Sequence, residues 1–304
     1  MNIIFWLPAF AHYSSSLCHS LVLAYLYSAF IEANNIFRKL NFMPIIKPTK
    51  STAPVFEPKD DYIIGKYMDT TKFISLLYKQ ALFFCRVDKL EDKFEGTSVQ
   101  TNFNERIKGL ESLRASGFFS FDMSDEDILK SIKEDEIFEE KQRAINCIDC
   151  WNKSENESAA LWKIYSDFSK GIMIKSSISR LVKSFEKTEN EIQLSEVRYK
   201  LYKKEKLPYG NSNYPFLFKQ KAYSYEDEIR LIYGINTEDG SDWKHDWSKE
   251  EVEEGIYIKT DLNELISEIV ISPYSHQWYF DLILDVTKKY NLDKVVVKSE
   301  FSAY

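Results

Sequence analysis

Within residues 225–233, three charged side chains stand at alternate positions, in the order Glu226, Glu228 and Arg230. On a β-strand these three side chains point to one face of the sheet. Neighbouring carboxylates raise each other's pKa and an adjacent arginine lowers it, so such a row can tune a catalytic acid. The same row is also typical of a cross-strand charge ladder, and the sequence leaves both interpretations open.

A second set of polar and aromatic side chains indicates a pocket wall. Helical spacing runs from residue 157 to 168, after a strand predicted at 144–151 and a short polar loop. On this helix Ser158, Trp162 and Tyr165 share one face, which therefore carries a hydroxyl, an indole and a phenol. Such faces often line small-molecule sites, but both rings would also serve as ordinary core residues against the strands.

Several motifs around this helix follow one another in a recognisable order. They are Cys150-Trp151, Glu157-Ser158, Trp162-x-x-Tyr165 and Gly171 before a β-branched strand, together with Lys66-Tyr67 and the segments 92–96, 225–230 and 270–273. This pattern resembles the bacterial domain of unknown function 2971 family. The resemblance spans residues from about 62 to the C-terminus, and it implies a single domain without a settled activity.

The order of the motifs is also similar to that of ADP-ribosyltransferases. In those enzymes an opening strand carries His or Arg, a middle segment supplies Ser or Tyr, and a late strand carries Gln/Glu-x-Glu. Here Lys66 stands at the first position, where it departs from the pattern, and Glu226-Asp227-Glu228 stand at the last.

The resemblance to ADP-ribosyltransferases implies NAD as the cofactor and a glycosyl transfer from it. Glu228 would bind the nicotinamide-ribose hydroxyl and stabilise an oxocarbenium-like transition state, while Glu226 would orient the acceptor. Tyr67 or Tyr165 would stack on nicotinamide. The NAD-binding set that follows is Lys66, Tyr67, Ser158, Trp162, Tyr165 and Arg230. An enzyme of this kind would fit a role in phage defence or as a toxin.

Two other functions remain open. A non-catalytic module could hold a ligand or a partner in the same place. A metal-dependent nuclease would use carboxylates and a lysine around Mg²⁺, here Asp92, Lys93 and Glu95 with Glu228, although the Glu-x-Lys spacing of such strands is absent.

The composition indicates a folded globular protein. The 304 residues are 44% hydrophobic and 15% aromatic with few Gly and Pro, which excludes disordered and fibrous classes. The formal charge of −7 argues against general nucleic-acid binding, which needs a basic surface. A basic and aromatic run at residues 198–209 is either a phosphate or single-strand site or a solvated loop. The resemblance to ADP-ribosyltransferases, rather than the composition, implies a small nucleotide as the ligand.

The cysteines are predicted to be reduced and inert. Cys147 and Cys150 form a CxxC pair, but no second pair of Cys or His follows at metal-ligand spacing. On a strand, residues three apart face opposite sides, which also opposes shared ligation. No metal is predicted, and the free thiols, with Cys18 and Cys85, are consistent with a cytoplasmic protein.

The amino-terminal residues 1–42 are predicted to be an apolar appendage. Residues 1–31 contain no charged side chain, and the apolar run at 17–31 is short for a bilayer span and lacks the preceding positive charge of a signal peptide. A dispensable or misassigned extension, a docked helix, and a membrane association through this segment all remain open. A proline-rich linker at 43–61 and one domain at 62–304 follow.

Helix and strand patterns mix without strict alternation, which predicts an α+β fold with a mixed, mostly antiparallel sheet and packed helices. Strands are predicted at 62–67, 81–87, 144–151, 171–175, 194–202, 226–233, 256–259, 269–272 and 294–298. Helices are predicted at 70–79, 103–113, 125–143, 157–168, 176–187, 261–267 and 274–290. Thr70 or Thr71 is expected to cap the first helix, and Ser124 with Asp127 to form a capping box on the third.

Overall fold

The computed structural model describes residues 45–46, 56–117, 124–167, 169–208, 213–235 and 254–302. The predicted appendage and most of the predicted linker lie outside these residues, as does Cys18. Within the described ranges, no helix combines the length and the apolar character needed to cross a bilayer.

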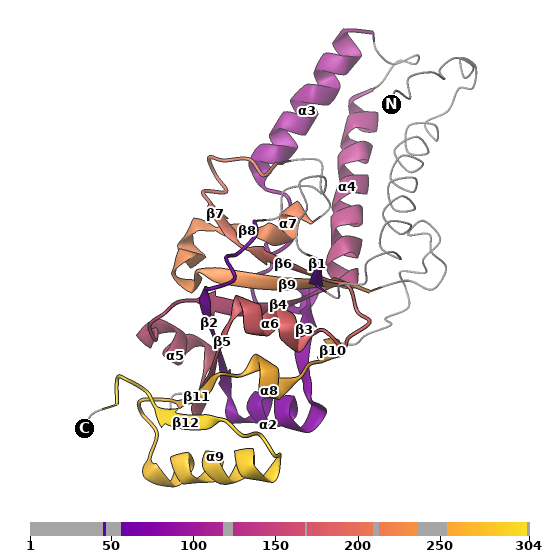
Figure 1. The fold of residues 1–304 in the computed structure, drawn as a ribbon. Coiled ribbons are helices and arrows are strands. Elements are labelled where there is room, and N and C mark those ends of the chain that lie inside the picture. The colour runs from indigo at the N-terminus through magenta and orange to yellow at the C-terminus, as the bar shows by residue number, and fades with distance from the viewer. Residues whose placement is uncertain are drawn as a thin grey trace.

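The predicted α+β architecture is confirmed, because helices pack on a mixed, mostly antiparallel sheet (Figure 1). The sheet runs in the order β1-β6-β9-β4-β2-β5-β11-β12, with a branch in which β3 pairs with β4 and β10 pairs with β3. A small second sheet joins β7 and β8. In the described part of the chain the strands are β1 (Ile45–Ile46), β2 (Ile63–Asp69), β3 (Ala81–Arg86), β4 (Asn146–Lys153), β5 (Gly171–Ser177), β6 (Ile192–Glu196), β7 (Arg198–Lys200), β8 (Phe218–Gln220), β9 (Glu228–Gly234), β10 (Gly255–Lys259), β11 (Glu268–Ile271) and β12 (Val295–Lys298).

Strand β4 stands at the centre of the sheet because three other strands pair with it. Along one edge it pairs with β9, from Asn146 opposite Gly234 to Asn152 opposite Glu228. Along its other edge β3 pairs near the start of β4 and β2 pairs near its end. The strands β2 and β3 therefore diverge from each other beside the middle of β4.

Helix α2 (Thr70–Lys79) connects β2 to β3, as the apolar spacing predicts. Its cap is Asp69, whose side chain accepts a hydrogen bond from the Lys72 backbone N–H, so the cap predicted at Thr70 or Thr71 is wrong. The Thr70 hydroxyl instead bonds the Lys170 carbonyl, which ties the helix start to a distant loop. Asp and Thr are both good caps, and tertiary contacts decide between them.

The main apolar core lies on one face of the sheet. Alternate strand residues such as Ile64, Trp151 and Leu231 point to this face. Four helices cover it: α2, α6 (Ile178–Ser184), α8 (Leu262–Leu265) and α9 (Gln277–Lys289). Each large apolar side chain buried here contributes about 1.5–3 kcal/mol relative to exposure, and this is the largest of the apolar clusters formed by the described residues.

The opposite face of the sheet carries two smaller apolar clusters instead of one core. Over β4 and β9, Ile148 and Ile232 pack with α7 (Tyr214–Leu217) and with Phe218 of β8. Over β2, β5 and β11, the short helix α5 (Ala159–Tyr165) packs its buried residues on Tyr67, Met173 and Val270. Between these clusters, the same face of β9 carries the charged residues Glu228 and Arg230.

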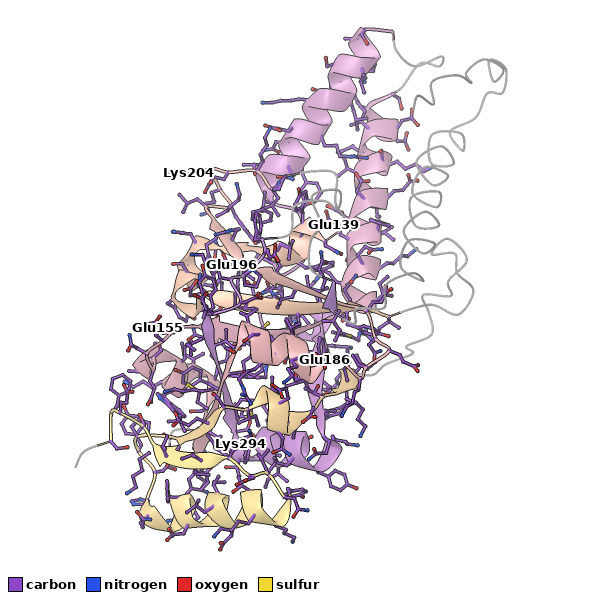
Figure 2. The ribbon with its side chains drawn as sticks, viewed as in Figure 1. Glu139, Glu155, Glu186, Glu196, Lys204 and Lys294 are labelled. Atoms are coloured by element: carbon purple, nitrogen blue, oxygen red, sulfur yellow. The ribbon has the colours of Figure 1, made fainter. Side chains whose placement is uncertain are left out.

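Helices α3 (Gln100–Ala115) and α4 (Asp125–Ile145) form a hairpin that projects from the body of the molecule (Figure 1). The capping box predicted at Ser124 and Asp127 is confirmed. Glu139 on α4, labelled in Figure 2, accepts hydrogen bonds from the backbone N–H and the hydroxyl of Ser98 and so holds the loop that enters α3.

Two strand predictions need correction. The strand predicted at 194–202 is divided at Val197 into β6 and β7, which belong to different sheets. The strand predicted from residue 226 begins only at Glu228, because Glu226 ends a 3-10 helix (η2, Lys221–Glu226). Asp227 between them has a φ of 36°, a left-handed conformation that Asp tolerates better than most residues.

Candidate functional site

Arg230 and Glu228 form a fully buried ion pair on the face of β9 between the two smaller apolar clusters. The Arg230 side chain is 0% exposed, and its Nε and Nη2 donate to the two carboxylate oxygens of Glu228 at 2.8 and 2.9 Å. Its Nη1 donates to the Phe216 carbonyl and lies 2.9 Å from Oε1 of Glu95. A guanidinium matches such a set because its planar fork presents several N–H donors at once.

Lys219 on β8 joins three carboxylates of the same group. Its Nζ lies 2.6 Å from Oε2 of Glu226, 3.4 Å from Oε2 of Glu228 and 3.5 Å from Oε2 of Glu95. Three carboxylates therefore face two cations in a region where all five side chains are buried. We call these five residues the acidic cluster: Glu95, Lys219, Glu226, Glu228 and Arg230.

Glu226 lies where the acidic cluster meets the surface. The Tyr165 hydroxyl, at the end of α5, donates to Oε1 of Glu226, and the Tyr165 side chain is 43% exposed. Tyr225 beside it is 45% exposed. Tyr223 lies over Lys219, with 4.9 Å between the ammonium nitrogen and the ring centroid. The buried carboxyl group of Glu226 is thus bordered by tyrosine rings that reach solvent.

Burial and neighbouring charges move the pKa values of the two glutamates in opposite directions. Burial raises the pKa of Glu226 above its ordinary value, against the opposing effect of Lys219 and of the Tyr165 hydrogen bond. Burial also acts on Glu228, but Arg230 and Lys219 outweigh it and lower the pKa of Glu228. Glu228 therefore holds a charge, and Glu226 is the acid that can exchange a proton.

We expect the raised pKa of Glu226 to make folding stability fall as the pH rises. A carboxyl group whose pKa is higher in the folded than in the unfolded state contributes stability below its ordinary value of 4.5 and loses it as the pH rises through the folded value. Glu226→Gln removes this contribution. Urea unfolding between pH 4 and pH 8 should therefore show that the variant gains stability relative to the natural protein as the pH rises.

Titrating groups that do not contact Glu226 are common to the two proteins in this comparison, so their effects cancel in the difference. A difference in unfolding free energy that stays constant across the pH range would contradict the raised pKa of Glu226.

Trp162 and Ser158 support the site rather than line it. Trp162 is 1% exposed and packs edge-on against Tyr67, with 5.0 Å between ring centroids. Ser158 is the N-cap of α5, and its backbone N–H donates to the Tyr67 hydroxyl at 2.8 Å. Of the aromatic residues predicted to line a pocket, Tyr165 reaches Glu226, whereas the side chains of Trp162 and Tyr67 belong to the apolar cluster beneath α5.

Lys66 points to the opposite face of the sheet from Tyr67, Glu228 and Arg230. The register places Lys66 on the face of Trp151 and Asp149, and its Nζ donates to Oδ1 of Asp149 at 2.6 Å and to the Cys150 carbonyl at 2.9 Å. Lys66 is therefore not brought together with the glutamates.

Cys147 and Cys150 lie on opposite faces of β4, as the strand spacing predicts. Cys147 lies opposite Tyr233 over the main core, and burial raises its pKa to about 12. Cys150 lies opposite Arg230, and burial, followed by the charge of Glu228, raises its pKa well above the usual range. Neither thiol ionises near neutral pH. In the described parts of the chain, no three His, Cys, Asp or Glu side chains are grouped so as to hold a metal ion.

Two residues of the acidic cluster were missed as partners of the predicted glutamates. Lys219 follows the apolar Phe216-Leu217-Phe218, and a lysine in such a setting must find carboxylates when it is buried, which is the signal that could have identified it. The sequence indicated Glu95 only as part of the metal-dependent nuclease hypothesis, together with Glu228. In the structure, Arg230 contacts both carboxylates.

Comparisons with family models and with curated proteins give no match to this chain. The candidate site therefore has to be interpreted from its own geometry.

Proposed function

We propose that the chain is an enzyme that transfers the ADP-ribosyl group of NAD, with Glu226 as the proton-accepting carboxylate. The observation that carries the proposal is the Tyr165–Glu226–Lys219 contact, in which an acid of raised pKa lies beneath a half-exposed tyrosine. A general base works best when its pKa lies near the operating pH, and burial moves a carboxyl group in that direction.

The acidic cluster suits the positively charged part of NAD. Nicotinamide is cationic in NAD, and the ribose carries positive charge in an oxocarbenium-like transition state, so three carboxylates facing two cations stabilise both. The rings of Tyr165 and Tyr225 offer stacking surfaces for a flat cationic ring. The diphosphate is repelled by the same carboxylates and must lie outside the cluster.

The chemical step is a substitution at the ribose carbon that bears nicotinamide. The bond from this carbon to the ring nitrogen breaks, and both electrons leave with neutral nicotinamide. A new bond forms from the oxygen of water or of an acceptor hydroxyl, whose proton passes to Glu226. The Lys219 ammonium holds the Glu226 carboxylate through Oε2, and Tyr165 holds it through Oε1.

Glu228 has a different place in this proposal from the one that motif order implies. Arg230 takes both of its carboxylate oxygens, and the side chain is 4% exposed, so it acts by its fixed negative charge. Direct binding of the ribose hydroxyl by Glu228 stays a prediction.

Purified protein incubated with NAD labelled in the adenine ring tests the proposal. We expect released nicotinamide together with labelled acceptor or free ADP-ribose, and a loss of about 100-fold or more in Glu226→Gln. Tyr165→Phe should lose less, because Lys219 still holds the carboxylate. Glu155→Gln, the same change at an exposed position before α5, is the matched control and should keep full activity. The absence of label transfer and of NAD hydrolysis, or an undiminished Glu226→Gln, would overturn the proposal.

A non-catalytic ligand-binding module is the second candidate, because Arg230 and Glu228 bond each other and are therefore not available for catalysis. Both side chains are buried and find all their partners within the protein, as a purely structural cluster requires. Such a module would bind a nucleotide or nicotinamide without consuming it. Calorimetric titration with a non-hydrolysable NAD analogue, beside the turnover assay, separates the two functions.

The resemblance to the domain of unknown function 2971 family belongs to the same proposal. If the chain consumes NAD in phage defence or as a toxin, its expression should deplete cellular NAD and arrest growth, and Glu226→Gln should relieve both effects.

A further inference from the structure

Glu157 is a buried carboxylate that accepts hydrogen bonds both from the nearby helix α5 and from residues close to the C-terminus. Its side chain belongs to a residue that is 8% exposed, directly before the N-cap of α5. Oε2 accepts from Nε1 of Trp162 at 2.8 Å and from the hydroxyl of Ser299, and Oε1 accepts from the backbone N–H of Glu300 at 2.8 Å. A carboxylate with three donors is held in one place, because each charge-assisted bond is stronger than a neutral one.

These bonds connect α5 to the segment that follows the last strand. Trp162 lies within α5, whereas Ser299 and Glu300 come directly after β12. Strand β12 forms one edge of the sheet and lies beyond β5 and β11 from β2, on the same side of the molecule as α5 (Figure 1). Ser299 is 4% exposed, so the junction is enclosed by protein.

A helix as short as α5 needs such a connection. It has 7 residues, and isolated helices of that length are not stable in water. At 1.5 Å per residue it is about 10 Å long, so a tilt of about 10° about its start moves its far end by roughly 2 Å. Tyr165 is at that far end, and a displacement of this size breaks a hydrogen bond.

We propose that Glu157 is a positioning residue that ties the start of α5 to the C-terminal segment and thereby keeps the Tyr165 hydroxyl on Glu226. The proposal deepens the function given above, on which its meaning for activity rests, but the position of Tyr165 can be measured without any substrate.

Glu226 itself reports whether Tyr165 is in place. The Tyr165 hydrogen bond lowers the pKa of Glu226, so its loss raises that pKa. The other groups that face Glu226 stay the same in the comparison: the ammonium of Lys219 on β8, the carboxylate of Glu228 on β9, and the phenols of Tyr199, Tyr223 and Tyr225.

The test is a carbon-13 NMR titration of the Glu226 carboxyl group in the full chain, with the resonance assigned by its absence in Glu226→Gln. Glu157→Gln turns one acceptor oxygen into an N–H₂ group that cannot accept a bond. We expect it to raise the pKa of Glu226 by about 0.5 unit, in the same direction as Tyr165→Phe. The double variant Glu157→Gln/Tyr165→Phe should show no more than the shift of Tyr165→Phe alone, because both changes remove the same bond.

Glu155→Gln is the control for the change in charge. Glu155 lies two residues before Glu157 in the loop beside α5, where Figure 2 labels it, and it is exposed. The Glu155→Gln variant should leave the pKa of Glu226 unchanged. Ser299→Ala takes the place of Glu157→Gln if the latter does not fold, because it removes one donor and keeps the carboxylate. We expect Ser299→Ala to raise the pKa of Glu226 by a smaller amount. It should cause no further shift when Tyr165→Phe is already present.

An unchanged pKa of Glu226 in Glu157→Gln, or shifts that add in the double variant, would overturn the positioning role. If Glu157→Gln shifts the pKa of Glu226 as expected but the protein does not consume NAD, the proposed function is removed and the positioning role stands. If the protein consumes NAD but Glu157→Gln leaves the pKa of Glu226 unchanged, the positioning role is removed and the proposed function stands.

Discussion

Replacing Arg230 with methionine is expected to lower the free energy of unfolding by about 3–5 kcal/mol. The methionine fills part of the space, but Glu228 loses both N–H donors and Glu95 loses its nearest guanidinium nitrogen. The three carboxylates of the acidic cluster then remain buried with Lys219 as the one cation that they share within it. The cost comes chiefly from these uncompensated charges and less from the lost attraction itself.

Urea unfolding at pH 7 measures this loss, and Arg114→Met is the matched control. Arg114 pairs with Asp125 where both side chains reach solvent, so its removal should cost less than about 1 kcal/mol. Arg230→Lys should lie between the two, since it keeps the charge and loses the planar fork. A loss below about 1 kcal/mol in Arg230→Met would mean that the acidic cluster does not stabilise the fold.

Trp162→Ala is expected to cost about 3–5 kcal/mol of stability. The ring is 1% exposed, it packs edge-on against Tyr67, and its N–H is the donor within α5 to Glu157. The substitution therefore leaves both a cavity under α5 and a carboxylate with one donor fewer.

Trp278→Ala is the control for Trp162→Ala. Trp278 is 55% exposed on the outer side of α9, and its replacement should change stability by less than about 0.5 kcal/mol. Urea unfolding followed by far-ultraviolet circular dichroism compares the two without relying on tryptophan fluorescence. Equal losses in the two variants would show that α5 is not anchored through its tryptophan.

Local patterns were sufficient for most of the helices and strands. The spacing of Phe73, Leu76 and Leu77 predicts α2, and the structure has that helix at the predicted bounds. The alternation through Cys147 to Trp151 predicts β4 and the opposite orientation of its two cysteines. These features depend on residues within a few positions of one another, which is the range over which periodicity carries information.

The parts that were missed depend on contacts between distant segments. Glu226 and Glu228 do lie close together, because both contact Lys219. They are not on one strand, since Asp227 between them has a left-handed backbone conformation. Lys66 and Tyr67 are neighbours in the sequence, and their opposite orientation follows from the strand alternation that also underlies the Glu226–Arg230 prediction. The apolar residues before Lys219 indicate that it is buried, but tertiary packing sets the partner of a buried charge, so no spacing along the chain identifies the carboxylates that Lys219 contacts.

The pairing of β4 with β9 also bears on how fast the molecule can fold. Cys150 lies opposite Arg230, so the central ladder joins residues that are far apart along the chain. Proteins dominated by such non-local pairings fold slowly, in milliseconds to seconds, because the entropy of closing a long loop must be lost before any contact compensates for it. During synthesis, the edge of β4 stays open until residue 234 has emerged, and a product truncated before that point should aggregate through this unpaired edge.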